Sequence, residues 1–201
     1  MALDDNLFHS NHGLFVLIHG PMFSGKTEEL VAALSRAQNY AKLNVQAFKP
    51  IIDHRYGENN IVTHNGVHFP AIEVKDSKEC YKHLNSNIQV IGIDEVQFFD
   101  EGIIDFILEQ RKNKKIVIAE GLFADYKQEP FRLGKSTKTM ADLLVHANYA
   151  IQKTAFCFAC GKPALYTMRL AASSELVLIG GAKDYVAACP DHYALPDLNK
   201  K

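Results

Sequence analysis

The residue types best suited to chemistry stand at positions 20–27, which read GPMFSGKT. This stretch fits the phosphate-binding pattern G-x-x-x-x-G-K-[ST], and it joins an apolar run at 14–18 to a segment of helical spacing. Glycines let successive main-chain N–H groups turn towards phosphate oxygens, and the start of a helix favours the same anions. The pattern therefore predicts a nucleoside triphosphate site rather than a chance glycine-rich turn. Its phosphate-binding residues would be Gly20, Pro21, Met22, Phe23, Ser24, Gly25, Lys26 and Thr27.

Two carboxylates extend this predicted site. The apolar run at 88–93 ends in Asp94 and Glu95, and ligands of an open parallel sheet lie beyond the carboxyl ends of its strands. Lys26 would bind the β- and γ-phosphates, while Thr27 and Asp94 would hold Mg²⁺. Glu95 would serve as a general base or orient a water molecule. A solvated acidic pair is the less favoured alternative, and these elements alone do not separate a hydrolase from a kinase.

Cysteine and histidine form a second chemical group near the C-terminus. Cys157 and Cys160 are followed by Cys189 and His192, in the pattern C-x2-C…C-x2-H. Three thiolates and one imidazole complete a tetrahedral site, so the predicted Zn²⁺ is structural and leaves no open position for catalysis. Zinc would tie together the ends of a loop whose middle folds over a small ligand. Cys80 has no partner in this pattern and is interpreted as a lone buried thiol.

Strands and helices alternate along the segment that must position these groups. Strands are predicted at 14–18, 45–50, 88–93 and 115–119, and helices at about 27–42, 76–84, 101–112 and 136–146, the last capped by Ser136 or Thr137. This order predicts an α/β fold with a parallel sheet and right-handed crossovers. The polar stretch at 53–68 is interpreted as a surface loop, with a mobile lid or an oligomer contact as alternatives. Short strands at 165–170 and 175–179 indicate a small second domain.

Composition and charge restrict the class of protein. The chain has 201 residues, of which 47% are hydrophobic and 22% charged, and its net charge is −1. These values fit a soluble globular protein with no general attraction for nucleic acid or an anionic membrane. The polar segment at 1–13 does not resemble a signal peptide, and no apolar run is long enough to span a bilayer. We therefore expect a cytoplasmic protein with reduced cysteines, no nucleic-acid partner and no membrane partner.

The three motifs together resemble one enzyme family. GPMFSGKT at 20–27, DE-x-QFF at 94–99 and the Cys/His pattern at 157–192 occur in the order found in the type II thymidine kinases, which contain zinc and are usually tetrameric. The resemblance implies a RecA-like P-loop domain at 14–154, a zinc-binding domain with a lasso-like substrate loop at 155–193, and tails at 1–13 and 194–201. It also implies transfer of phosphate from ATP to the 5′-hydroxyl of thymidine, with Glu95 as the base.

The resemblance assigns roles to residues that the patterns alone would place in an ordinary core or loop. Asp53 and Arg55 match a D-x-R-Y element near the phosphates, where a guanidinium group would stabilise charge on the transferring group. Main-chain groups of the lasso would hold the pyrimidine, and Tyr185 would lie near the 3′-hydroxyl. The residues predicted to line the nucleoside site are Met22, Phe98, Leu122, Tyr126, Phe131, Thr167, Leu176, Gly180 and Tyr185.

A few positions depart from the family pattern. Val96 replaces a glycine that many members carry after the acidic pair, and this change could shift Glu95 slightly. His192 replaces a fourth cysteine, which zinc accepts. Tyr126 stands where many members have phenylalanine. The resemblance further implies a homotetramer and feedback inhibition by thymidine triphosphate.

Two other functions compete with thymidine phosphorylation. A P-loop ATPase or GTPase with a partner-binding zinc domain would hydrolyse its nucleotide without a nucleoside acceptor. An inactive homologue could act as a nucleotide-responsive scaffold, although Lys26, Asp94 and Glu95 are all retained. Basic and acidic residues nearly balance between the Cys/His pairs, which is a poor electrostatic footprint for nucleic acid. The resemblance therefore implies a kinase of pyrimidine salvage that supplies DNA synthesis, and the charge balance argues against a nucleic-acid-binding zinc domain.

Overall fold

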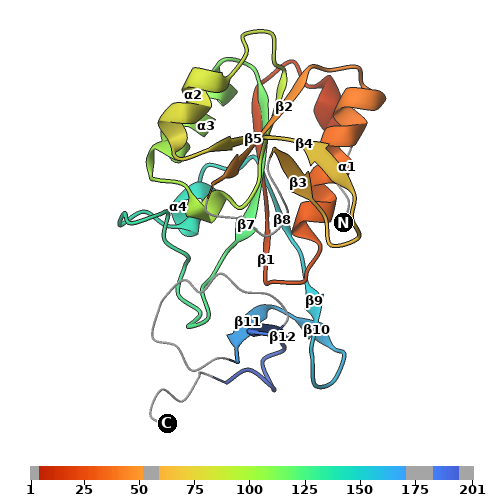
Figure 1. Cartoon of the computed structure of the whole chain (residues 1–201), viewed down its shortest axis with the longest axis vertical. Helices are drawn as coiled ribbons and strands as arrows, with labels where there is room; N and C mark the ends of the chain where they lie inside the picture. The colour runs from red at the N-terminus through yellow and green to blue at the C-terminus, as the bar shows by residue number, and fades with distance from the viewer. Residues whose placement is uncertain (1–4, 52–58, 171–182, 195–201) are drawn as a thin grey trace.

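A six-stranded sheet forms the centre of the computed structural model, which describes residues 5–51, 59–170 and 183–194 (Figure 1). The strand order is β5-β2-β6-β7-β1-β8, and every neighbouring pair is parallel. This arrangement confirms the predicted α/β fold with a parallel sheet. Its strands are β1 (Leu14–Gly20), β2 (Val45–Pro50), β5 (Ile72–Val74), β6 (Val90–Ile93), β7 (Ile116–Leu122) and β8 (Tyr149–Gln152).

Helices cover both faces of this sheet. In Figure 1, α1 (Lys26–Asn39) lies on one side, and α2 (Ser77–His83) and α3 (Gly102–Lys112) lie on the other. Side chains alternate between the two faces of a strand, so β1 packs Phe15 and Leu17 with the α3 side and Val16 and Ile18 with the α1 side. The remaining described helices are α4 (Met140–Leu144) and the short 3-10 helices η1 (Asp5–His9) and η2 (Val96–Phe98).

The C-terminal section forms smaller β-structure near the end of the sheet where β1 and β7 finish (Figure 1). β9 (Ala155–Phe156) pairs with β10 (Pro163–Ala164), and β11 (Tyr166–Arg169) pairs with β12 (Tyr185–Ala188), both antiparallel. β11 confirms the strand predicted at 165–170, whereas the strand predicted at 175–179 lies outside the described residues. The section has its own hydrophobic cluster, and the limits of the predicted domains stay predictions.

The polar stretch at 53–68 is a plain loop only in part, so that interpretation was wrong for its second half. β3 (Asn60–Val62) and β4 (His68–Pro70) form an antiparallel hairpin, in which Ile61 lies opposite Phe69. Both side chains are buried on the α1 side of the sheet. Two apolar residues therefore anchor the hairpin, and their wide spacing in a polar segment hid it from the sequence pattern.

Two further elements differ from expectation. α4 begins later than predicted, because Thr139 rather than Ser136 or Thr137 caps it: the Thr139 hydroxyl oxygen accepts from the Ala141 N–H, and the Asp142 carboxylate accepts from the Thr139 N–H. The edge strand β8 was not predicted, because most of its residues are exposed and show no apolar run.

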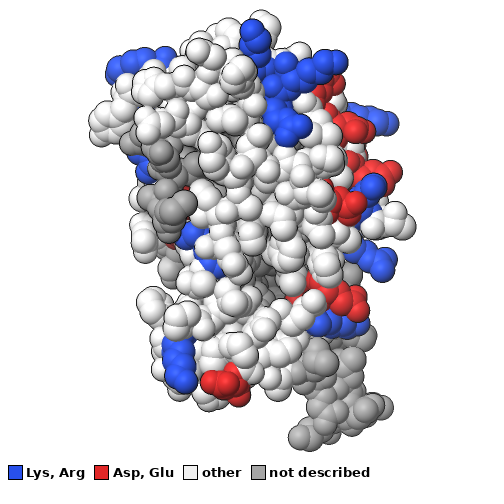
Figure 2. All heavy atoms as spheres, turned by 180° about the vertical axis from the view of Figure 1, so that it is seen from behind, with Lys and Arg blue, Asp and Glu red and all other residues white. Residues whose placement is uncertain are grey.

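Charged side chains of both signs share the surface. On the face in Figure 2, Lys and Arg side chains lie among Asp and Glu side chains along one side, and a broad area carries neither. This mixture agrees with the net charge of −1. Within the described parts of the chain, no helix is both long and apolar enough to cross a membrane.

Candidate active site

The loop between β1 and α1 curls around the ammonium group of Lys26. Phe23 and Gly25 have positive φ angles of 64° and 74°, and this left-handed conformation is the one that glycine adopts freely. The Ser24 hydroxyl donates to the Pro21 carbonyl oxygen (2.8 Å), and Lys26 Nζ donates to the same oxygen (3.0 Å). Lys26 is buried. The loop therefore holds a desolvated cation that a phosphate oxygen could take over from the carbonyl.

The first glycine of the loop is required by a close main-chain approach. A Cβ atom on Gly20 would lie 2.4 Å from the carbonyl oxygen of Lys153. Lys153 follows β8, its N–H donates to the His19 carbonyl oxygen (2.7 Å), and its Nζ pairs with Glu29 of α1 (3.0 Å). The segment that leads towards the C-terminal section therefore packs directly on the start of the phosphate loop.

Acidic residues at the ends of β6 and β7 face the same loop. On β6, Val90 and Gly92 contact α1, so the alternation of side chains directs Asp94 to that face. On β7, Ile118 packs on the α1 side, so Glu120 follows it there. Because β6 and β7 are paired in parallel with Ile93 opposite Ala119, the next residues, Asp94 and Glu120, lie side by side.

Glu120 is a fully buried carboxyl group that the sequence analysis did not identify. Its Oε1 accepts a hydrogen bond from the main-chain N–H of Glu95 (3.2 Å). Burial raises the pKa of Glu120, the charge of Glu95 raises it further, and Lys26 acts in the opposite direction. Three carboxyl groups and one ammonium group therefore meet at the carboxyl end of the sheet.

Glu95, the predicted base, occupies a constrained turn. It is half-buried, immediately precedes η2 and has φ 45° and ψ 49°, a left-handed conformation that is uncommon for a residue with a Cβ atom. Its Oε2 accepts a hydrogen bond from Gln97 Nε2 at 2.6 Å. Val96, the departure from the family pattern, is fully buried in the core on the α3 side. The turn thus places one side chain in the core and the preceding carboxylate in the acidic group.

The predicted nucleoside-binding residues on β11 and β12 connect to the phosphate loop. The Met22 N–H donates to Thr167 Oγ1 (2.9 Å). Arg169 lies opposite Tyr185 in the β-ladder and two residues after Thr167, so all three share one face of the hairpin. An Arg169 N–H group donates to the Tyr185 hydroxyl (2.8 Å), and the guanidinium carbon lies 3.8 Å from the centre of the Tyr126 ring.

The other predicted nucleoside-binding residues pack at the edge of the main core. The Phe98 and Phe131 rings meet edge to face, with centroids 5.8 Å apart. Phe98 and Leu122 are half-buried and contact the cluster on the α3 side. The remaining predicted site residues, Asp53, Arg55, Leu176 and Gly180, lie outside the described residues.

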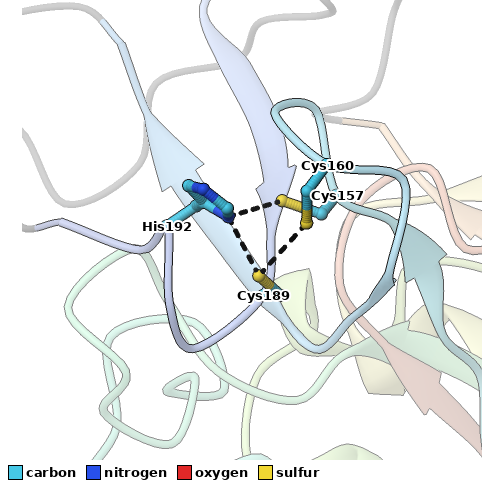
Figure 3. Close-up of side chains that lie close together, drawn as sticks. All are labelled: Cys157, Cys160, Cys189 and His192. Carbon is cyan, nitrogen blue, oxygen red and sulfur yellow. Dashed lines mark hydrogen bonds between the residues drawn. The ribbon is translucent and has the colours of Figure 1, made fainter.

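The four predicted metal ligands converge, as Figure 3 shows. Their ligand atoms all lie within 4.8 Å of one another, with Cys160 Sγ 3.8 Å from Cys189 Sγ and His192 Nδ1 3.3 Å from Cys189 Sγ. Sulfur atoms around a tetrahedral zinc ion with Zn–S bonds of about 2.3 Å would stand about 3.8 Å apart. Burial opposes ionisation of Cys157, but main-chain N–H groups lower its pKa to about 6. The donor set therefore fits structural zinc.

Sequence reasoning missed three residues that organise these groups. Glu120 follows an apolar strand just as Asp94 does, so the same signal was present, but the predicted strand stopped at 119. Gln97 lies inside the DE-x-QFF motif, yet its contact with Glu95 depends on a turn that no local pattern specifies. Arg169 lies in a predicted strand, where only the pairing of β11 with β12 shows its contact with Tyr185.

Comparison with known proteins places this arrangement in a family. A family model described as thymidine kinase matches residues 13–193. A thymidine kinase from Thermococcus kodakarensis is 39% identical over 196 residues, which cover 92% of this chain and 96% of that protein. The chain belongs to the thymidine kinase family. This thymidine kinase family member therefore has the phosphate loop, acidic pair and Cys/His group within one matched region, and it is an enzyme of the kinase class.

Solved structures show a more distant likeness to this thymidine kinase family member. Domain III of the Thermotoga maritima replication initiation protein DnaA is 14% identical, with a TM-score of 0.43 over 73% of this chain and 57% of that chain. The Legionella pneumophila ATPase DotB is 15% identical, with a TM-score of 0.42 over 79% of this chain and 46% of that chain.

Proposed function

We propose that the protein phosphorylates thymidine at its 5′-hydroxyl with ATP as the donor, giving thymidine monophosphate and ADP. The observation that carries this proposal is the meeting of Lys26, Asp94 and Glu95 at the carboxyl end of one parallel sheet, in a chain of the thymidine kinase family. A phosphate-binding cation, a metal-supporting carboxylate and a candidate base are the groups that phosphoryl transfer to a hydroxyl requires.

The donor half of the reaction would use the phosphate loop. Lys26 would exchange its hydrogen bond with the Pro21 carbonyl for one with a phosphate oxygen, and the loop N–H groups would hold the remaining oxygens. Thr27 and Asp94 are the residues suited to hold Mg²⁺, which neutralises charge on the phosphates when bound. Asp53 and Arg55, which match the family's D-x-R-Y element, would add a guanidinium group to the transferring phosphate.

The acceptor half would use Glu95 and the C-terminal section. Glu95 would accept the proton of the 5′-hydroxyl as that oxygen attacks the γ-phosphorus, so its carboxylate must point at the hydroxyl. Met22, Phe98, Leu122, Tyr126 and Phe131 would line the nucleoside site. Thr167, Leu176, Gly180 and Tyr185 would close over it from the lasso. The Met22–Thr167 hydrogen bond supports this arrangement, because it joins the phosphate loop to β11.

Zinc would hold the lasso in place. Cys157 and Cys160 stand before the predicted loop and Cys189 and His192 after it, so the ion would fix the two ends without touching substrate. We also propose a cytoplasmic homotetramer that thymidine triphosphate inhibits. The location follows from the polar N-terminal segment and the reduced cysteines expected from the sequence, while the tetramer and the inhibition follow from the family resemblance. Gel filtration and inhibition assays would test the last two.

The main rival is a P-loop ATPase whose zinc domain binds nucleic acid or protein. Mixed charge on the face in Figure 2 gives little support to a nucleic-acid partner. A panel of nucleosides with ATP, analysed by mass, would separate the two. Thymidine monophosphate is expected to be the main product of the acceptor, while hydrolysis of ATP to ADP and phosphate with no nucleoside monophosphate formed would favour the rival.

The role of Glu95 can be tested by Glu95→Gln, with Glu101→Gln as a matched control on the exposed start of α3. We expect Glu95→Gln to lower turnover by roughly 10²- to 10⁴-fold, because the amide cannot accept the proton, while ATP binding persists. Glu101→Gln should leave turnover unchanged. Near-normal turnover in Glu95→Gln would remove Glu95 from the role of base.

A further inference from the structure

The conformation of Glu95 needs support from its surroundings. Its φ and ψ angles of 45° and 49° lie in the left-handed region, which a residue with a Cβ atom occupies mainly where its contacts enforce it. A half-buried glutamate side chain that no neighbour held would also sample several rotamers. A base must instead present its carboxylate within hydrogen-bond reach of the hydroxyl. Both the main chain and the side chain of Glu95 therefore need groups that hold them in place.

Gln97 fixes the side chain of Glu95. It is fully buried, its Nε2 donates to Glu95 Oε2 (2.6 Å), and its Oε1 accepts from the Leu122 N–H (3.2 Å). The amide therefore has a donor contact and an acceptor contact that together define its orientation. Gly121 makes the space for it, since a Cβ atom there would lie 2.3 Å from Gln97 Oε1. The carbonyl oxygen of Gln97 also accepts from the Gly134 N–H (3.3 Å).

Glu120 fixes the main chain at Glu95. Its carboxylate is fully buried on the α1 face of β7, in a strand whose preceding residues are all apolar. Oε1 accepts the hydrogen bond of the Glu95 N–H (3.2 Å). Glu95 is the second residue after β6 and the one in the left-handed conformation, and the N–H before it, that of Asp94, donates to the Phe48 carbonyl oxygen (2.9 Å). An apolar residue at position 120 would fill the strand equally well but would leave that N–H without this acceptor.

We propose that Gln97 and Glu120 are positioning residues that clamp Glu95, Gln97 through its carboxylate and Glu120 through its N–H group. The inference rests on the proposed function, because it takes Glu95 as the base. The clamp also connects the base to the nucleoside site, since Gln97 holds the N–H of Leu122, a predicted nucleoside-binding residue. Neither residue touches substrate in this account, and both act through the placement of Glu95.

The test compares Gln97→Met and Glu120→Met, which keep side-chain volume and remove the polar contacts, with Glu120→Gln, which keeps an acceptor oxygen. Gln110→Met serves as a control for loss of a buried glutamine on α3. We expect kcat to fall by roughly 10- to 100-fold in both methionine variants, as for a misplaced catalytic group. KM for ATP should stay within about threefold of wild type, and Glu120→Gln and Gln110→Met should keep near-normal kcat.

Combining each methionine change with Glu95→Gln separates positioning from general damage. If the clamp acts through Glu95, the methionine change causes no further loss in kcat in a protein that already carries Glu95→Gln. Wild-type kcat in Gln97→Met and Glu120→Met would overturn the inference, and so would an equal loss of kcat in the Glu95→Gln background.

Two further variants test the inference if a methionine variant fails to fold. For Glu120, a large loss of kcat in Glu120→Gln would overturn the inference, because this variant keeps an acceptor oxygen for the Glu95 N–H. For Gln97, Gln97→Glu is the alternative, because it keeps an acceptor for the Leu122 N–H and replaces the donor to Glu95 with a carboxylate oxygen that repels the Glu95 carboxylate. Near-normal kcat in Gln97→Glu would overturn the inference for Gln97. Near-normal kcat in Glu95→Gln alone removes Glu95 from the role of base, and the inference falls with that role.

Discussion

At the scale of single residues, the chemical groups could be predicted where the sequence carries a local pattern. Lys26 lies in the loop after β1, Asp94 lies at the end of β6, and the two halves of the Cys/His pattern converge. Each of these residues belongs to a short local pattern: the phosphate loop, the acidic end of an apolar strand, or a C-x2-C or C-x2-H pair. Glu120, Gln97 and Arg169 could not be found in the same way. Their partners lie on other strands, so their roles appear only when β6, β7, β11 and β12 are placed.

The burial of Lys26 gives a prediction at this scale. Lys26→Ala removes the only positive charge assigned to the centre of the described phosphate loop, so ATP affinity and turnover should both fall, each by more than about tenfold. Lys78→Ala, on the exposed surface of α2, is the matched control and should change neither. ATP titration calorimetry and steady-state kinetics measure the two effects. Unchanged kinetics in Lys26→Ala would be incompatible with the phosphate-loop assignment.

At the scale of elements, the strands and helices with strong apolar periodicity were predicted and the marginal ones were not. β1, β2, β6, β7, α1 and α3 match their sequence patterns because they bury most of one face or both. β8 is mostly exposed, and the β3–β4 hairpin is anchored by one buried pair, so tertiary contacts decide their structure. The start of α4 was misplaced because three hydroxyl residues stand close together before it.

The cap of α4 gives a stability prediction. Thr139→Ala removes the side-chain acceptor for the Ala141 N–H and one contact of Asp142, so the free energy of unfolding should fall by about 1 kcal/mol. Thr137→Ala, two residues earlier and exposed, should change it by less than about 0.5 kcal/mol. Denaturant unfolding of both variants measures the difference. Equal effects would show that Thr139 does not begin the helix.

At the scale of the whole molecule, two structural units contribute to one proposed site. The parallel sheet places Lys26, Asp94 and Glu95 at its carboxyl edge, and the β11–β12 hairpin reaches this edge through the hydrogen bond from the Met22 N–H to Thr167. Lys153 packs against Gly20 where the chain passes from one unit to the other. The sequence indicated both units, but not the contacts between them, because these depend on the folded path of the chain.

Loss of zinc should therefore weaken the binding of thymidine more than the binding of ATP. Replacement of His192 by alanine should lower bound zinc below about half an equivalent and raise KM for thymidine, because the ends of the lasso are no longer fixed. Asp191→Ala is the adjacent exposed control and should retain the metal. Metal analysis after gel filtration measures the zinc content, steady-state kinetics with varied thymidine measure its KM, and ATP titration measures the affinity for ATP. Full zinc content in His192→Ala, or a parallel loss of ATP affinity, would argue against this division of roles.

The central claim is that this site transfers phosphate to a nucleoside and does not simply hydrolyse ATP. The most direct measurement is ADP formation by the purified protein with and without thymidine, together with the amount of thymidine monophosphate. We predict little ADP without thymidine, and with thymidine one thymidine monophosphate for each ADP. ADP formed at the same rate in both reactions, with no thymidine monophosphate, would contradict the account.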